Sequence, residues 1–283
     1  MSSNGVAANG VAIVTGAAQG VYVLRARLLR WSVNNGRSGK AIALRLSRDG
    51  FSIVVNDVPS KAAEAEKVVA MIQETGRKAH AHLADVTNET QVKSLVSESV
   101  SKLGPLSVMV ANAGISEVLP LLDMSVDDVQ RMCNINIIGV FNCFQAACKQ
   151  FISQGTGGKL ITASSVAGHR TFANLTHYSA TKFAVRGLVQ GYAQEFAKYK
   201  ITANGYCPGI TNTPMLQKID DEVIALRGGG ERGDAIKEYQ SMASLGRLGQ
   251  AEDLAKLVSF LAGPDSDYIT GQNIVVDGGI VLT

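Results

Sequence analysis

Tyr178 and Lys182 lie four residues apart in the stretch "YSATK", within a segment that we expect to be helical. Side chains at this spacing share one face of a helix. A tyrosine hydroxyl titrates at about pH 10, but a nearby ammonium group stabilises the phenolate and lowers that pKa. Such a pair can protonate a carbonyl oxygen as hydride arrives, or deprotonate an alcohol in the reverse direction. The alternative is a surface pair on a helix, because this spacing is common by chance.

Two more polar residues strengthen the catalytic interpretation. Ser165 ends an apolar strand thirteen residues before Tyr178 and can donate a hydrogen bond to the same substrate oxygen. Asn136 lies among apolar neighbours in a long predicted helix. A buried asparagine needs hydrogen-bond partners, so Asn136 either makes a structural bond or holds a water near Lys182.

A glycine-rich turn, "TGAAQG", follows the first predicted strand and contains Gly16, Gln19 and Gly20. Free backbone N–H groups of such a turn, together with the start of a helix, can hold a pyrophosphate. Asp57 ends the second predicted strand, where a carboxylate accepts hydrogen bonds from ribose hydroxyls and repels a 2′-phosphate. No arginine follows Asp57, and this favours NAD over NADP. The alternative is that Asp57 is an ordinary turn residue at the end of a strand.

Polar residues also follow the third and fourth predicted strands. They are Asp85 with Val86, and Asn112 with Ala113 and Gly114. Adenine or ribose can lie against such strand ends, although Asx residues and glycine also favour plain turns.

The elements that must position these residues alternate between short apolar runs and longer helical patterns. The expected strands are 11–15, 52–56, 78–83, 107–111, 159–163, 202–207 and 273–276, and the expected helices are 40–48, 62–75, 89–103, 126–153, 178–199 and 252–262. Strands rich in Val and Ile that alternate with helices predict a parallel sheet covered on both faces. We therefore predict one α/β domain over residues 1–283, a Rossmann-type doubly wound sheet of about seven strands.

Composition limits the other classes of function. The net charge of +3 includes four arginines in residues 21–38, so the rest of the chain sums to 3 − 4 = −1 and gives no support for nucleic-acid binding. The four cysteines show no CxxC spacing and predict buried free thiols in a reducing compartment. We expect no metal site, no apolar run of membrane-spanning length and no secretory signal, and hence a cytoplasmic protein.

Residues 211–249 follow the sixth predicted strand and have a less regular pattern, with three glycines at 228–230. Because ligands of open α/β sheets bind at the carboxyl ends of the strands, we expect a substrate lid here. A plain surface excursion is the alternative.

Taken together, these motifs resemble those of the classical short-chain dehydrogenase/reductase family from residue 11 to residue 279. The resemblance implies that Asn136, Ser165, Tyr178 and Lys182 form a catalytic tetrad, with Tyr178 and Lys182 also meeting the cofactor. It further implies that the segment containing Pro208, Gly209, Thr211 and Thr213 meets the nicotinamide or the phosphates. His169 and His177 flank this site and are interpreted as structural.

Within the family, stretches such as "YSATKFAVRGL" and "NGYCPGITNTPM" are similar to acetoin (diacetyl) reductases and butanediol dehydrogenases. This implies a small vicinal diketone or hydroxyketone as substrate. Family members are commonly tetramers, and the helices expected at 126–153 and 178–199 resemble those that pair between subunits.

One segment departs from the family pattern TGxxxGxG. Eighteen residues, 21–38, separate Gly20 from Gly39, where the family has one. We interpret this segment as a short in-frame intron that was translated together with the coding sequence, because "VYVLRARLLRW" brings apolar residues to a functional turn. A natural loop extension is the alternative. Long insertions cost little closure entropy, so we expect the fold to persist and the following helix to start at Ser38–Gly39.

The insertion leaves three functions open. The first is an NAD(H)-dependent reductase of diacetyl, acetoin, or another small ketone or polyol. The second is a folded but inactive homologue whose glycine-rich turn no longer takes up dinucleotide. The third is a basic insert that binds a partner or a membrane surface.

Overall fold

The computed structural model describes residues 10–18 and 38–282; residues 1–9, 19–37 and 283 lie outside this description. Seven strands form one parallel sheet in the order β3-β2-β1-β4-β5-β6-β7. Their bounds are β1 Val11–Thr15, β2 Ser52–Asp57, β3 Ala79–Leu83, β4 Leu106–Ala111, β5 Gly158–Ala163, β6 Ile201–Pro208 and β7 Asn273–Val276. The predicted seven-stranded, doubly wound fold is therefore confirmed, each strand lying within two residues of its expected position.

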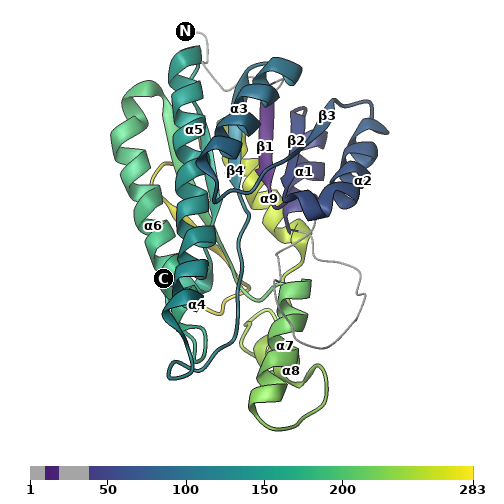
Figure 1. Ribbon diagram of the computed structural model, residues 1–283, viewed down its shortest axis with the longest axis vertical. Coiled ribbons are helices and arrows are strands. Elements are labelled where there is room, and N and C mark those ends of the chain that lie inside the picture. The colour runs from purple at the N-terminus through teal and green to yellow at the C-terminus, as the bar shows by residue number, and fades with distance from the viewer. Residues whose placement is uncertain (1–9, 19–37, 283) are drawn as a thin grey trace.

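Helices connect the strands and cover both faces of the sheet (Figure 1). Their bounds are α1 Ser38–Arg48, α2 Ala62–Gln73, α3 Glu89–Leu103, α4 Val126–Cys133, α5 Gly139–Gln154, α6 Thr176–Phe196, α7 Pro214–Leu226, α8 Asp234–Ser241 and α9 Ala251–Ala262. Side chains of α3, α5 and α6 pack on one face, and those of α1, α2 and α9 pack on the other.

Alternation along β1 explains why the sheet needs both layers. Val11 and Ile13 join the core under α3 and α5, whereas Ala12 and Val14 join the core under α1 and α9. All four are fully buried. A strand apolar on both faces is stable only between two helical layers, as expected of a parallel sheet. The strand order reverses between β1 and β4, which places a ligand crevice at their carboxyl ends.

Helix α1 begins at Ser38, where the sequence predicted that a helix would restart. Its apolar face, including Ile42 and Leu46, is fully buried against β1, β2 and α9. Of the predicted insertion 21–38, only Ser38 belongs to the described residues. The sheet and α1 thus take the arrangement expected of the family on both sides of this segment.

The region 211–249 contains two helices that the sequence analysis missed, α7 and α8. They lie together beyond the carboxyl ends of the strands, at the lower end of the molecule in Figure 1. A start signal was present in the sequence, because Thr213 accepts a hydrogen bond from the Leu216 amide and Pro214 occupies the first helical position. The glycines at 228–230, all with positive φ, separate the two helices.

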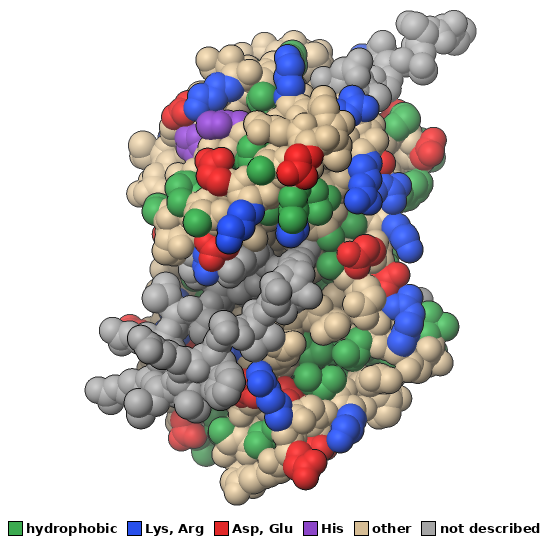
Figure 2. All heavy atoms as spheres, turned by 90° about the vertical axis from the view of Figure 1, so that its right-hand side faces the viewer, with side chains coloured by type: hydrophobic (Ala, Val, Ile, Leu, Met, Phe, Trp, Pro, Cys, Tyr) green, Lys and Arg blue, Asp and Glu red, His purple; other side chains and the backbone are tan. Residues whose placement is uncertain are grey.

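The described residues show how charged side chains, helices and cysteines are arranged. On the face seen in Figure 2, the acidic and basic side chains of the described residues are interspersed. No described helix combines the length and the apolar character needed to cross a membrane. Cys143, Cys148 and Cys207 are buried and Cys133 is partly buried, and all four are free thiols as predicted.

Candidate active site

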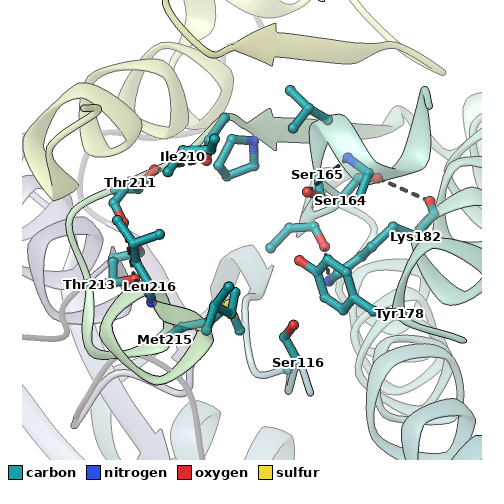
Figure 3. Close-up of a pocket in the computed structure, with 18 of the residues that line it drawn as sticks. Ser116, Ser164, Ser165, Tyr178, Lys182, Ile210, Thr211, Thr213, Met215 and Leu216 are labelled. Carbon is teal, nitrogen blue, oxygen red and sulfur yellow. Dashed lines mark hydrogen bonds between the residues drawn. The ribbon is translucent and has the colours of Figure 1, made fainter. Parts of the chain in front are cut away.

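A cavity opens at the carboxyl ends of β4, β5 and β6, and α7 and α8 form its outer wall (Figure 3). Its polar lining includes Ser165, Tyr178 and Lys182 from the predicted catalytic group. Predicted cofactor residues that also line it are Asn112, Gly114, Pro208, Gly209, Thr211 and Thr213. The fold therefore gathers these residues, which are spread over about a hundred positions of sequence, around one space.

Ser165 and Tyr178 meet on one side of this cavity. Ser165 follows β5 in extended backbone, and its hydroxyl accepts a hydrogen bond from the Ala167 amide at 3.1 Å, which fixes its direction. Tyr178 lies in the first turn of α6 and lines the same cavity as Ser165. Two hydroxyl groups that line one side of a cavity can both contact one oxygen atom of a substrate.

Lys182 lies one turn further along α6, behind Tyr178 as seen from the cavity. Its ammonium donates to the Ala163 carbonyl at 2.9 Å and lies 5.5 Å from the centre of the Tyr178 ring. The side chain of Ser164 donates to the Lys182 carbonyl at 3.1 Å and so ties α6 to the end of β5. The expected spacing of four residues thus places both side chains on the face of α6 that meets the sheet.

The electrostatics of Tyr178 and Lys182 are governed by burial. Burial raises the pKa of the Tyr178 hydroxyl to about 12, against a smaller lowering by the Ser165 hydrogen bond. Burial also lowers the pKa of the Lys182 ammonium to about 8. Removal from water disfavours the charged form of each group. The lowering of the Tyr178 pKa by Lys182 stays a prediction.

Asn136 lies in a π-helical turn, Asn134–Ile138, that joins α4 to α5 and was predicted as ordinary helix. Its amide donates to the Ile115 carbonyl at 3.0 Å and to the Thr181 hydroxyl at 3.1 Å, and its oxygen accepts from the Ile115 amide at 2.8 Å. These are the structural bonds that the sequence left as one alternative. A Cβ atom at Gly114 would lie 3.1 Å from Asn136 Oδ1 and 3.7 Å from Lys182 Nζ, so glycine keeps the space between them open.

Gly16 and Gly39 meet where the predicted pyrophosphate turn should lie. Gly16 has φ +63°, and a Cβ atom at Gly39 would stand only 2.3 Å from the Gly16 carbonyl oxygen. Glycine at both positions therefore lets the start of α1 pack directly on the turn after β1. Gln19 and Gly20, the other predicted residues of this turn, lie outside the described residues.

Asp57 lies at the end of β2, beside this turn, and only 4% of its surface is exposed. Its carboxylate accepts hydrogen bonds from the Ala18 amide at 3.0 Å and from the Val58 amide at 3.0 Å. The residue is thus more than a strand end: it links β2 to the glycine-rich turn.

The residues predicted after β3 and β4 make mainly structural contacts. Asp85 accepts from the amide and the hydroxyl of Thr87, which is turn chemistry, and Val86 packs on Gly139. The Asn112 side chain donates to the Thr15 carbonyl at 2.9 Å and accepts from the Tyr206 hydroxyl at 2.7 Å. Asn112 and its neighbour Ala113, whose amide is bound by the Thr15 hydroxyl, therefore tie β4 to β1.

The segment after β6 lies across the cavity from Tyr178 (Figure 3). The Thr211 hydroxyl donates to the Gly209 carbonyl at 3.2 Å, and the Thr213 hydroxyl, which caps α7, donates to the Thr211 carbonyl at 3.2 Å. A Cβ atom at Gly209 would meet Asp277 at 2.5 Å, so this turn is pressed against the chain that follows β7.

Several lining residues were missed by the sequence analysis: Ser116, Tyr206, Met215, Leu216, Ile219 and Tyr239. Most lie on α7 and α8, and no residue-level pattern marked them before the helices were known. His177 is buried but does not line the cavity, and neither does His169. Desolvation lowers the pKa of both imidazoles, consistent with uncharged structural residues.

Comparison with known proteins gives the class of this chain. A family model described as enoyl-(acyl carrier protein) reductase matches residues 35–281. A diacetyl reductase, (S)-acetoin forming, from Staphylococcus epidermidis is 42% identical over 271 residues, covering 95% of this chain and 98% of the relative. An L-2,3-butanediol dehydrogenase from Corynebacterium glutamicum is 40% identical over 271 residues, covering 96% and 98%.

Solved structures agree. A blue fluorescent protein from a metagenomic library, solved in complex with NADPH, superimposes with a TM-score of 0.79 at 32% identity, covering 96% of this chain and 98% of the other. The chain is thus an oxidoreductase with a dinucleotide-binding fold. It belongs to the short-chain dehydrogenase/reductase family, as the motifs predicted.

Proposed function

We propose that this chain is an NAD(H)-dependent reductase that interconverts diacetyl, acetoin or a similar small ketone with its alcohol. The observation that carries the proposal is the meeting of Ser165 and Tyr178, with Lys182 behind them, in a cavity whose other walls are mostly apolar. The named relatives that share about two-fifths of their residues with this chain support the substrate class.

The residues of this chain would handle the proton. Tyr178 gives its hydroxyl proton to the carbonyl oxygen, while the Ser165 hydroxyl donates a hydrogen bond to the same oxygen. Because its pKa is about 12, Tyr178 is fully protonated at neutral pH and ready to donate. The Lys182 ammonium then stabilises the phenolate that remains. A water in the space beside Gly114, between Asn136 and Lys182, would pass the replacement proton.

A nicotinamide dinucleotide supplies the hydride when it is bound. The described residues fit such a group: glycine at positions 16 and 39 lets the start of α1 pack directly on the turn after β1, and the buried Asp57 carboxylate lies at the end of β2, beside that turn. A 2′-phosphate would meet this buried carboxylate, which favours NAD over NADP. Thr211 and Thr213 stand where the nicotinamide amide or the phosphates can be held.

The test is steady-state oxidation of NADH by diacetyl, repeated with NADPH. We expect turnover with NADH and a kcat/KM at least about tenfold lower with NADPH, because a phosphate beside a carboxylate is repelled. Reduction of simple aldehydes alone, with diacetyl inert, would remove the substrate assignment. A preference for NADPH would remove the cofactor assignment only.

The Lys182 ammonium gives the proposal a pH dependence. Since burial lowers its pKa to about 8, the charged form predominates below that pH and is lost as the pH rises through it. We therefore expect kcat/KM for NADH in diacetyl reduction to be level on the acidic side and to fall about tenfold per pH unit above about pH 8.

The described titratable groups in and near the cavity that could compete have pKa values away from 8. The Tyr178 hydroxyl and the Cys207 thiol titrate at about 12 and about 11, and both histidines titrate below their usual range. A rate that stays level up to about pH 10 would contradict the role of the Lys182 charge.

The remaining assignments extend this proposal. Exposed apolar side chains on α5 and α6, Phe141 and Phe183, are compatible with pairing of these helices between subunits, and the homotetramer stays part of the proposal. The position of α7 and α8 over the cavity supports a substrate lid at 211–249, and one sheet spanning residues 11–276 supports a single domain.

The inactive homologue remains the second candidate function, because residues 21–38 stand between Gly20 and Gly39 in the sequence of the glycine-rich turn.

A further inference from the structure

The loop that follows β4 carries a buried hydroxyl group without a partner. Ser116 is 4% exposed, and its Oγ atom makes no hydrogen bond with any described residue. Buried side-chain polar atoms are normally hydrogen-bonded, so each exception needs an explanation. Of the described residues with such unpartnered buried atoms, Ser116 is the one that lines the cavity.

The backbone around Ser116 is held from both sides. Asn136 makes hydrogen bonds to both the amide and the carbonyl of Ile115, the residue before it. From the lid, Lys218 of α7 donates to the Ser116 carbonyl at 3.4 Å, and Glu222 accepts from the Val118 amide at 2.9 Å. The position of the hydroxyl is therefore set by the catalytic side and by the lid together.

The direction of the hydroxyl is toward the reaction space. Figure 3 shows the Ser116 oxygen pointing into the region bordered by Tyr178 and Met215. Apolar side chains, including Ile210 and Leu216, form much of the remaining wall. A small ligand here would find one polar contact at Ser165 and Tyr178 and a separate one at Ser116.

We propose that Ser116 is a specificity-determining residue whose hydroxyl binds the second oxygen of a vicinal diketone or hydroxyketone. The assignment rests on the proposed function and adds the residue that separates such substrates from simple ketones. A site with a buried polar group discriminates strongly against a ligand that leaves that group unpaired. The Ser116 hydroxyl can donate to a ketone oxygen and can also accept from an alcohol.

The experiment compares diacetyl with 2-butanone, which has the same four-carbon chain and lacks the second oxygen. For Ser116→Ala we expect kcat/KM for diacetyl to fall about tenfold and that for 2-butanone to change less than about twofold, the loss typical of one hydrogen bond. Equal losses for both ketones would mean that Ser116 only shapes the cavity and would overturn the assignment. No loss for either ketone would overturn it as well.

A matched control is Ser164→Ala. Ser164 lines the same cavity, but its hydroxyl is already used by the Lys182 carbonyl. We expect this variant to change kcat/KM for both ketones by a common factor. A selective loss for diacetyl here would show that the effect is not specific to Ser116 and would count against the proposal.

Thermal unfolding separates recognition from a structural role. Removing an unpartnered buried hydroxyl should leave Tm unchanged or raise it, whereas removing a hydroxyl with a structural partner lowers Tm. A clear drop in Tm for Ser116→Ala would therefore overturn the proposal. If the unmodified chain reduces neither ketone, the proposed function fails and this assignment fails with it; if it reduces both without selectivity at Ser116, only this assignment fails.

Discussion

Replacing Tyr178 by phenylalanine should lower kcat for diacetyl reduction by about 10³-fold while NADH still binds. The substitution removes one oxygen atom and leaves the ring that packs on Lys182 at 5.5 Å. Ser165 keeps its hydrogen bond from the Ala167 amide, so the substrate oxygen retains one donor. What is lost is the proton that must reach that oxygen.

Tyr206→Phe is the matched control for this measurement. Tyr206 also lines the cavity and is fully buried, but its hydroxyl donates to Asn112 at 2.7 Å. Its removal should weaken the link between β6 and β4 and reduce kcat by much less than the Tyr178 change. NADH binding, followed by fluorescence titration, should persist in both variants. A Tyr178→Phe protein with near-normal kcat would show that another group gives the proton.

The sheet could be predicted from sequence because its signal is local. The central strands β1 and β2 are runs rich in Val and Ile between turn residues, as expected of parallel strands that are buried on both faces. The prediction of the helices was less complete. The π-helical turn at Asn134–Ile138 has the composition of ordinary helix, so its sequence does not distinguish it. The hydrogen bonds of Asn136 to Ile115 that accompany this turn involve a different part of the chain, which a local pattern cannot show.

The residues of the candidate active site divide in the same way: features within one helix could be predicted from the sequence, and contacts between distant segments could not. The spacing of Tyr178 and Lys182 could be interpreted directly, because both lie on one helix. The contacts of Asn112 could not, because its partners, Thr15 and Tyr206, come from strands about a hundred residues away on either side. The raised pKa of Tyr178 could not be predicted either, because its main cause is burial, which depends on how distant segments pack around the side chain.

Deleting Val21 to Arg37 should leave the fold intact and increase kcat/KM for NADH by about 10²-fold. The deletion restores the spacing Gly20-Ser38-Gly39. The structure favours this junction, because Gly39 already packs on the Gly16 carbonyl and α1 is already in place on β1. Only Gln19 and Gly20 then need to connect Ala18 to Ser38. A misplacement of about 1 Å in a binding group can cost about 10²-fold, which sets the size of the expected gain.

The control keeps the length and removes the sequence: a Gly/Ser segment of equal length in place of Val21 to Arg37. If the spacing of the turn limits cofactor binding, this variant should bind NADH as weakly as the unmodified chain. If it matches the deletion instead, the apolar and basic residues of the segment are responsible. Equal activity of the deletion and the unmodified chain would identify the segment as a tolerated loop, because loop closure itself costs little free energy. In that case the two ends of the turn, fixed by Gly16 and Gly39, would be sufficient to organise the cofactor site.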